Sequence, residues 1–440
     1  MHIIIPLLLV AVVLLVIRGR RTSNSNKSRP TGALPPVEKI PLDTLTVPVA
    51  ATDTATVADP DPSLLAAPVH DHDHGQDGLD QDGHDQDGHD HTPPEGTFAA
   101  DESDFHPVHH GKNWKGGCKF DPAEVRRTRN FATPKIDTSN LPAPDARIVN
   151  AFKVIDIARI KDTMLKLTGE VPVTVNGVTS TLATRNTHSK ELDIAMGFIE
   201  AQYAAMGLKT VRDPYTVRGK KLNNLVIELP GKTNPSRIVF VGAHLDSTAG
   251  SPWGNEKVAP GADDDGSGTA GMLELARALK DLELPFTVRL IHFTGEEQGL
   301  WGSYAYSDKV AAAKTDVVAM VEIDMISYCA KPGNRLDIHD DIDQNGSHEL
   351  TVRFFRAIKR YGINLTPVDT HNNAVKDRSD HAGFLDHGYK AVLVSEEFTD
   401  DGFNPNYHTV NDRVKNCNLP YMVEVLKAVT AVVAELADLK

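Results

Sequence analysis

Short apolar runs alternate with segments of helical periodicity in the chain beyond about residue 145. A continuous apolar run of a few residues is typical of a strand that is covered on both faces. Such runs predict strands at residues 223–229, 237–243, 287–293, 317–323 and 391–395. Apolar residues spaced along one face of a helix predict helices at residues 149–167, 190–206, 268–280, 347–361 and 420–439.

This alternation of strands and helices predicts an α/β fold, a mainly parallel, twisted sheet with helices on both faces. In such sheets, ligands bind beyond the carboxyl ends of the strands. Residues that can hold a metal or move a proton follow three of the expected strands at that end, namely His244, the pair Glu296 and Glu297, and Asp324. We therefore expect one functional site at the carboxyl edge of the sheet.

An acidic, glycine-rich loop joins the strand at 237–243 to the helix at 268–280. Residues 241–268 are VGAHLDSTAGSPWGNEKVAPGADDDGSG, and this segment contains His244 and the triplet Asp263, Asp264 and Asp265. Three adjacent carboxylates repel one another, and a bound divalent cation is the simplest compensation for their charge. Histidine nitrogen and carboxylate oxygen are ligands that zinc accepts. The loop therefore predicts a metal site.

The other acidic residues, together with a histidine near the end of the chain, predict that this metal site holds two ions. A two-metal site needs one carboxylate that bridges both ions, about 3.5–4 Å apart, and a few terminal ligands. Adjacent Glu296 and Glu297 can divide the work, one as general base and one as ligand. His408 lies in the segment Tyr-His-Thr near the end of the chain, and Asp246 is placed to orient the His244 imidazole.

Charge and cysteine content narrow the class of protein. The 440-residue chain has a formal net charge of -14, which argues against general nucleic-acid binding. The three cysteines, Cys118, Cys329 and Cys417, do not make a disulfide framework and match no zinc-finger spacing. We assign none of them a catalytic role.

The N-terminal part of the chain has a different composition. Residues 3–17 are apolar and end at a basic cluster, so residues 1–21 are expected to be a signal peptide or a membrane anchor. Residues 22–105 predict a disordered linker with a His/Asp-rich tract at 70–91. Residues 106–148 are expected to be an extension or pro-segment before a catalytic domain at 149–440. The protein is then secreted or extracytoplasmic, with membrane attachment through residues 3–17 left open.

Six motifs in order carry a family resemblance: HLDST, PGADDDGSG, TGEEQGLWGS, EIDM, RSDHAGF and YHTVND. Together they resemble the M28 family of zinc aminopeptidases, of the secreted leucine-aminopeptidase type, over roughly residues 150–440. The resemblance implies the zinc-exopeptidase fold, which is phosphorylase/hydrolase-like. It also implies peptide substrates and removal of the N-terminal residue by a two-zinc, metal-hydroxide mechanism.

The resemblance also assigns roles to individual residues. His244 and Asp324 would hold one zinc ion, and Glu297 and His408 the other, with Asp264 bridging both. Glu296 would be the general base and acid. Asp246 would orient His244, and Asp265 would support the ligands after a cis peptide bond that joins it to Asp264.

One motif departs from the family pattern. Related leucine aminopeptidases often carry Cys-Gly-Tyr-x-Cys before Ser-Asp-His, whereas this chain has AVKDR at residues 374–378. The disulfide and the tyrosine are therefore missing, which affects rate and side-chain preference rather than metal binding. Arg378 and Tyr407 are the residues we expect to contact substrate.

Alternatives remain open at this stage. A glutaminyl-cyclase-like acyltransferase would use one metal on the same fold, and a family carboxypeptidase would need a basic pocket, for which Arg378 is the candidate. A non-catalytic, receptor-like relative would have lost its metals and would lack ligands. A zinc-storage protein would bind metal through the tract at residues 70–91 and would lack peptidase activity.

The remaining histidines outside that tract are expected to be structural. We expect His292 to lie in the core and His381, with Asp380, to support the site. The others, for which no motif is present, are expected at the surface: His339, His348, His371 and His387.

Overall fold

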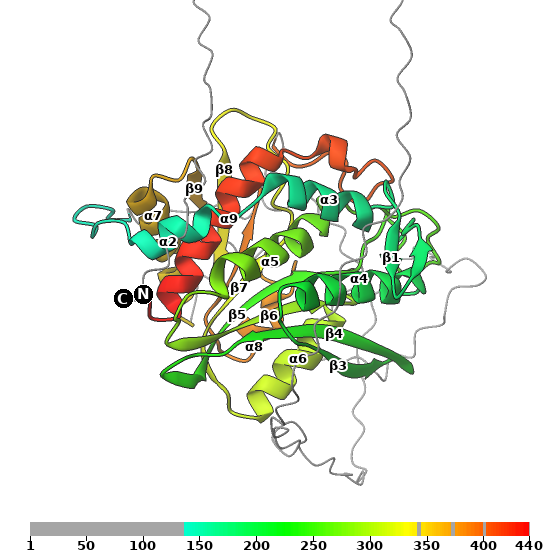
Figure 1. The fold of residues 1–440 in the computed structure, drawn as a ribbon, viewed down its shortest axis with the longest axis horizontal. Helices are drawn as coiled ribbons and strands as arrows, with labels where there is room; N and C mark the ends of the chain where they lie inside the picture. The colour runs from blue at the N-terminus through cyan, green and yellow to red at the C-terminus, as the bar shows by residue number, and fades with distance from the viewer. Residues whose placement is uncertain (1–135, 341–344, 371–374, 399–401, 440) are drawn as a thin grey trace, which may run out of the picture. The chain divides into compact units, whose positions relative to one another are not determined.

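A mixed sheet runs through the part of the chain that the computed structural model describes, residues 136–340, 345–370, 375–398 and 402–439 (Figure 1). Among these residues its eight strands follow the order β3-β4-β6-β5-β7-β10-β8-β9. Their bounds are β3 (Thr210–Val217), β4 (Lys220–Leu229), β5 (Asn234–His244), β6 (Phe286–Phe293), β7 (Asp316–Ile323), β8 (Arg335–Asp340), β9 (Thr366–Asp369) and β10 (Ala391–Ser395). A separate small hairpin pairs β1 (Val173–Val175) with β2 (Val178–Ser180).

The centre of the sheet is parallel and its outer parts are reversed. Strands β6, β5, β7 and β10 are adjacent and run in one direction. On one side β4 is antiparallel to β6 and β3 to β4, and on the other side β8 is antiparallel to β10, with β9 parallel to β8. The expected parallel sheet is thus present at the centre, and the antiparallel pairings lie outside it.

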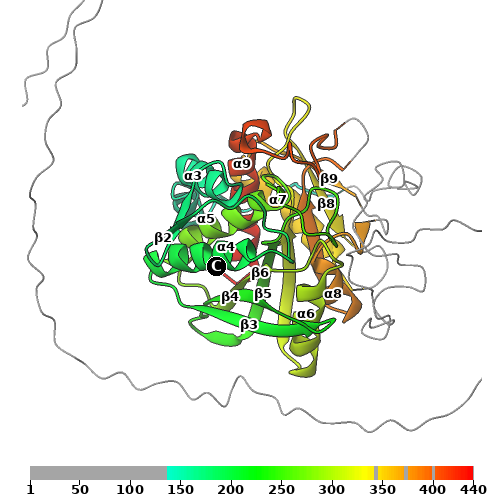
Figure 2. The same cartoon turned by 90° about the vertical axis from the view of Figure 1, so that its right-hand side faces the viewer.

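Helices cover both faces of this sheet, as the alternating pattern predicts (Figure 2). One face packs against α3 (Ile157–Leu167), α4 (Glu191–Ala205), α5 (Gly266–Leu279), α7 (His348–Tyr361) and α9 (Leu419–Leu436). The other face packs against α6 (Trp301–Ala312) and α8 (His381–Asp386). In β5, Val239 and Val241 face the first layer, whereas Ile238 and Phe240 face the second. Burial on both faces explains the unbroken apolar runs.

The helix expected at 149–167 is two helices, α2 (Ala146–Phe152) and α3. The break occurs at Asp156, whose side chain accepts hydrogen bonds from the backbone N–H groups of Ala158 and Arg159 and so caps the start of α3. Three strands of the outer sheet, β3, β8 and β9, and the two helices of the second layer were not predicted. Polar residues interrupt the apolar pattern of β8 and α6, β3 and β9 are only partly buried, and α8 is short, so their apolar periodicity is weak.

The expected signal or anchor at 1–21, the linker at 22–105 and the first part of the extension lie outside the described residues. The described end of that extension contacts α7, because Arg360 donates to the backbone oxygen of Ala143 at 2.7 Å. Among the described residues, no helix combines the length and apolarity that a membrane crossing requires.

We expect Gly242→Ala to destabilise the fold by about 1–3 kcal/mol, because it overpacks the sheet beneath the functional edge. A Cβ atom at Gly242 would collide with the Glu322 carboxylate and would lie 2.6 Å from Met320 Cε and 2.7 Å from Phe293 Cε2. Urea denaturation measures the change. Gly197→Ala in α4 is the control, because its Cβ meets only Val175 Cγ1 at 3.1 Å and alanine favours a helix. An unchanged unfolding free energy in Gly242→Ala would contradict this packing.

Candidate active site

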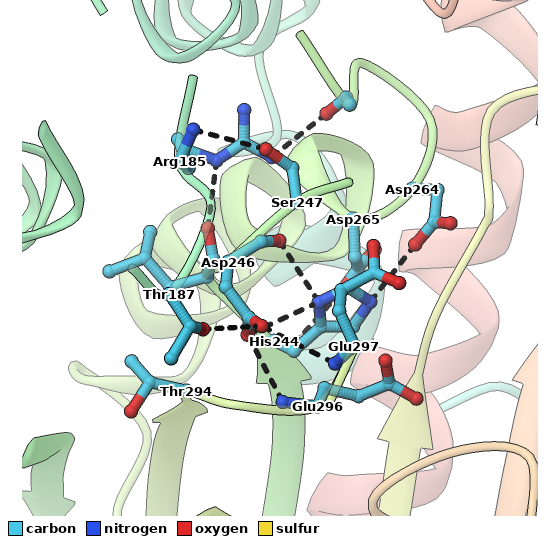
Figure 3. A network of polar contacts seen from close by, with 12 residues as sticks. Arg185, Thr187, His244, Asp246, Ser247, Asp264, Asp265, Thr294, Glu296 and Glu297 are labelled. Atoms are coloured by element: carbon cyan, nitrogen blue, oxygen red, sulfur yellow. Dashed lines mark hydrogen bonds and ion pairs between the residues drawn. The ribbon is translucent and has the colours of Figure 1, made fainter. Parts of the chain in front are cut away.

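The carboxyl ends of the central strands bring the expected residues together (Figure 3). His244 is the last residue of β5, Asp324 follows β7, and Glu297 lies in the turn after β6. Asp264 comes from the loop before α5, and His408 from the segment before α9. The first four side chains are buried, and the His408 side chain is 12% exposed. One edge of the sheet therefore collects residues from five separate segments.

The Asp264 carboxylate lies between two histidines. Its Oδ1 is 3.0 Å from His244 Nε2, and its Oδ2 is 3.0 Å from His408 Nε2. A second carboxylate faces each imidazole: Asp324 Oδ1 is 3.5 Å from His244 Nε2, and Glu297 Oε2 is 3.0 Å from His408 Nε2. Each histidine thus faces two carboxylates, with Asp264 shared. This is the arrangement of a bridging ligand and two terminal pairs.

Unsatisfied oxygen atoms indicate that the cluster suits cations. Among the described residues, nothing donates a hydrogen bond to Asp324 Oδ1 or Glu297 Oε1, although both atoms are buried. Buried carboxylate oxygens without donors are unfavourable unless a cation neutralises them. A set of two imidazoles and three carboxylates is the donor chemistry of zinc. The residues present therefore fit zinc.

The electrostatics of the cluster favour positive charge. Burial lowers the pKa of His408, but the Glu297 and Asp264 carboxylates outweigh it and raise the pKa to about 10. His244 behaves in the same way, since Asp324 and other carboxylates raise its pKa well above the ordinary value despite burial. The carboxylates thus hold positive charge on both imidazoles in a region of low dielectric constant.

Asp246 orients His244 and also holds the turn that carries the glutamates. The backbone oxygen of Asp246 lies 3.1 Å from His244 Nδ1, so Nδ1–H donates to it and Nε2 is the nitrogen that faces Asp264. The Asp246 carboxylate accepts from the backbone N–H groups of Glu296 and Glu297, each at 3.3 Å. The expected orienting role is therefore carried largely by the main-chain carbonyl.

Asp265 fixes the acidic loop against α5 and β5. The peptide bond from Asp264 to Asp265 is cis, as the family resemblance implies. The Asp265 carboxylate caps α5 by accepting from Gly268 N at 2.7 Å, and it accepts from His244 N at 3.1 Å. It therefore joins the start of α5 to the end of β5.

Sequence reasoning missed two residues that hold the same loop. The Asp412 carboxylate accepts from the backbone N–H groups of Asp263, at 3.0 and 3.1 Å, and of Asp264, at 3.1 Å. Because Asp412 follows His408 closely, it ties the segment of one histidine to the loop of the bridging carboxylate. Asp412 is the last residue of the YHTVND motif. The sequence analysis therefore identified the motif but gave Asp412 no role.

Arg185 is the second missed residue, and it is fully buried beneath the loop (Figure 3). Its guanidinium donates to the backbone oxygens of Leu245, Pro260 and Gly261 at 2.8, 2.6 and 2.9 Å. It fastens both ends of the loop and places a positive charge near its aspartates. A single arginine between expected elements carries no local sequence signal.

A pocket opens directly beside the cluster. Asp264, Glu296, Asp324 and His408 line it together with Met325, Arg378, Phe398, Phe403 and Tyr407. The aromatic rings form a continuous wall, with Phe403 and Tyr407 ring centroids 5.0 Å apart and Tyr407 stacked on His408 at 3.7 Å. Arg378 and Tyr407, the residues expected to contact substrate, both lie in this lining.

The other expected residues have mixed outcomes. His292 is a core residue, as expected, with Nε2 2.8 Å from the Tyr203 hydroxyl. The expectation that His339 lies at the surface is wrong, because the side chain is buried and Nε2 lies 2.9 Å from Ser395 Oγ. His371 lies outside the described residues. In the RSDHAGF motif, Ser379 Oγ donates to Asp324 Oδ2 at 2.8 Å, a supporting contact that the sequence reasoning did not name.

We expect Asp412→Ala to weaken zinc binding about 10- to 100-fold, because the variant releases the backbone of the bridging loop. Asp412→Asn keeps one acceptor oxygen and should lose less. Titration calorimetry with zinc measures both, with the exposed Asp281→Ala as the control. Zinc affinity equal to the wild type in Asp412→Ala would show that the loop is held without this contact.

Comparisons with known proteins agree with this geometry. The model of peptidase family M28 matches residues 224–433. Leucine aminopeptidase 1 of Fusarium vanettenii is 31% identical over 229 residues, which cover 49% of this chain and 55% of the relative. A probable zinc metalloprotease of Pyricularia oryzae is 28% identical over 320 residues, 64% of this chain and 62% of the relative. This chain thus spans little more than half the length of the curated relatives it matches.

Solved structures show the same fold. LapB of Legionella pneumophila superposes with a TM-score of 0.56 at 23% identity, covering 75% of this chain and 84% of LapB. A glutaminyl cyclase of Macrostomum lignano gives a TM-score of 0.53 at 18% identity, covering 69% of this chain and 98% of the cyclase. The fold itself is therefore shared by proteins with different names. The family match encloses the loop of Asp264 and every histidine and carboxylate around it, so residues 224–433 of this chain are similar to peptidase family M28.

Proposed function

We propose that this protein is a zinc-dependent aminopeptidase that removes the N-terminal residue of peptides. The observation that carries the proposal is the Asp264 carboxylate, shared between two histidines that each face a further carboxylate. Relatives named leucine aminopeptidase support the exopeptidase assignment.

The proposal assigns two zinc ions to the cluster. His244, Asp324 and Asp264 would hold one ion, and Glu297, His408 and Asp264 the other. Two such ions, when bound, lower the pKa of a water molecule and polarise the substrate carbonyl. The unsatisfied oxygens of Asp324 and Glu297 support the assignment, because an ion gives each of them a partner.

Glu296 is the proposed general base and acid. It lines the pocket beside the ligands, and its backbone N–H is held by the Asp246 carboxylate. Burial raises the pKa of Glu296 well above its ordinary value, which suits a group that takes a proton from water and returns it to the leaving amine. Its neighbour Glu297 points to His408, so the two adjacent glutamates have different tasks.

The pocket supports a preference for an apolar side chain on the substrate. Met325, Phe398, Phe403 and Tyr407 form an apolar and aromatic wall beside the metal ligands. A bulky apolar residue would bury its surface there, at about 25 cal/mol per Å² removed from water. Arg378 also lies in this lining, and it is not part of the apolar wall. A carboxypeptidase is therefore the second candidate function, in which the Arg378 guanidinium would hold the terminal carboxylate of the substrate.

The proposal includes an extracytoplasmic location. Its support is the apolar run at residues 3–17, which suits a signal peptide or a membrane anchor. The protein would then act on peptides outside the cytoplasm.

We expect Glu296→Gln in the full chain to lower kcat about 10²- to 10⁴-fold on leucyl and phenylalanyl anilides, because the variant cannot accept the proton. Bound zinc should be retained, whereas a chelator should abolish wild-type activity. The exposed Glu283→Gln is the matched control and should keep full activity. Wild-type protein that binds zinc but cleaves no substrate with a free amino group would refute the aminopeptidase assignment.

Arg378→Met separates the two candidate activities. An aminopeptidase should hydrolyse leucyl anilide, which has no carboxylate, with kcat/KM within about threefold of the wild type. A carboxypeptidase should cleave N-blocked peptides with a free carboxylate. Loss of the guanidinium should then lower kcat/KM for these peptides about 10- to 150-fold. Lys376→Met, which removes a neighbouring cation that pairs with Asp386 at 3.5 Å, is the control. Wild-type cleavage of the N-blocked peptides alone would favour the second candidate.

A further inference from the structure

We propose that Asp340, His348 and Asp369 form a second divalent-cation site, separate from the proposed catalytic centre. Asp340 is the last residue of β8 and Asp369 the last residue of β9, while His348 is the first residue of α7. Candidate ligand atoms of the three residues lie within 4.8 Å of one another.

The sheet topology puts this trio far from the catalytic residues. The catalytic cluster lies at the carboxyl ends of β5, β6 and β7, which are parallel. Strand β10 is parallel to β7, but β8 is antiparallel to β10, and β9 follows the direction of β8. The carboxyl ends of β8 and β9 therefore lie at the opposite edge of the sheet.

The geometry of the trio matches that of the proposed zinc ligands. His348 Nδ1 lies 2.9 Å from Asp340 Oδ2 and 3.6 Å from Asp369 Oδ2. In the catalytic cluster, His244 Nε2 lies 3.0 and 3.5 Å from its two carboxylate oxygens. In both places one imidazole nitrogen faces two buried carboxylates at nearly the same distances. The same donor set and spacing therefore occur twice in the chain.

The burial and charge of the trio suit a divalent cation. The Asp340 and Asp369 side chains are 0% and 3% exposed, whereas His348 is 31% exposed and leaves a path from solvent. Two buried carboxylates that face one imidazole nitrogen suit a divalent ion bound to neutral His348, because its two positive charges match the two negative charges of the carboxylates.

The structure also supplies a supporting contact and indicates the kind of metal. Thr351 Oγ1 donates to Asp340 Oδ2 at 2.7 Å, as hydrogen-bonding groups commonly do for ligating carboxylates. An imidazole with two carboxylates suits zinc or a similar transition ion, whereas Ca²⁺ and Mg²⁺ take oxygen ligands. An ion here would join β8 and β9 to the start of α7, a structural role at the sheet edge rather than a catalytic one.

Zinc stoichiometry of the full chain tests the site. Equilibrium dialysis against zinc, with metal analysis, should show that His348→Ala binds about one ion per chain fewer than the wild type. Asp369→Asn, which preserves the shape of the side chain, should lose the same ion. The His/Asp-rich tract at residues 70–91 is the same in the wild type and in the variants. Any zinc that it holds therefore does not contribute to the difference in stoichiometry between them. Hydrolysis of leucyl anilide should stay unchanged in both variants.

His387→Ala is the matched control, because His387 is also partly buried but pairs with one carboxylate, Asp308, at 2.7 Å. It should bind as much zinc as the wild type. Unchanged stoichiometry in both His348→Ala and Asp369→Asn would overturn the proposal and leave the trio as an ion pair. Equal losses in His387→Ala would overturn it as well, since the effect would not be specific to the trio.

Discussion

The shared carboxylate of Asp264 is the constraint on which the candidate active site depends. Its two oxygens lie 3.0 Å from nitrogens of different histidines, His244 on a central strand and His408 on a loop near the end of the chain. A carboxylate serves two such partners only if its backbone is fixed from both sides. The surrounding structure supplies that fixation through the start of α5, the end of β5 and the segment that follows His408.

Buried aspartates provide both the negative charge and the fastening of this loop. Asp265 caps α5 and accepts from the backbone of His244, and Asp412 accepts from the backbone of Asp263 and Asp264. Asp246 holds the turn of the two glutamates in the same way. Backbone N–H groups give these buried carboxylates hydrogen-bond partners inside the protein, so the loop keeps its shape.

The mixed sheet gives the molecule two edges with comparable chemistry. Its parallel centre gathers the proposed catalytic residues at one end of the strands, and the reversal between β10 and β8 places the carboxyl ends of β8 and β9 at the opposite end. His348 lies between Asp340 and Asp369 there. No single sequence motif contains these three residues, because they belong to β8, α7 and β9. Which elements lie next to one another there depends on the reversal of strand direction between β10 and β8.

The sequence by itself determined the central strands, most of the helices and the identity of the proposed ligands. Strands buried on both faces leave unbroken apolar runs, and residues such as His244 and Asp324 follow those runs directly. Only the tertiary structure decided the outer strands, the contacts of Arg185 and Asp412, and the burial of His339. These depend on contacts between segments far apart in the chain, where each residue type is common and no periodicity marks it. The tertiary fold alone determines which backbone groups a buried arginine or aspartate meets.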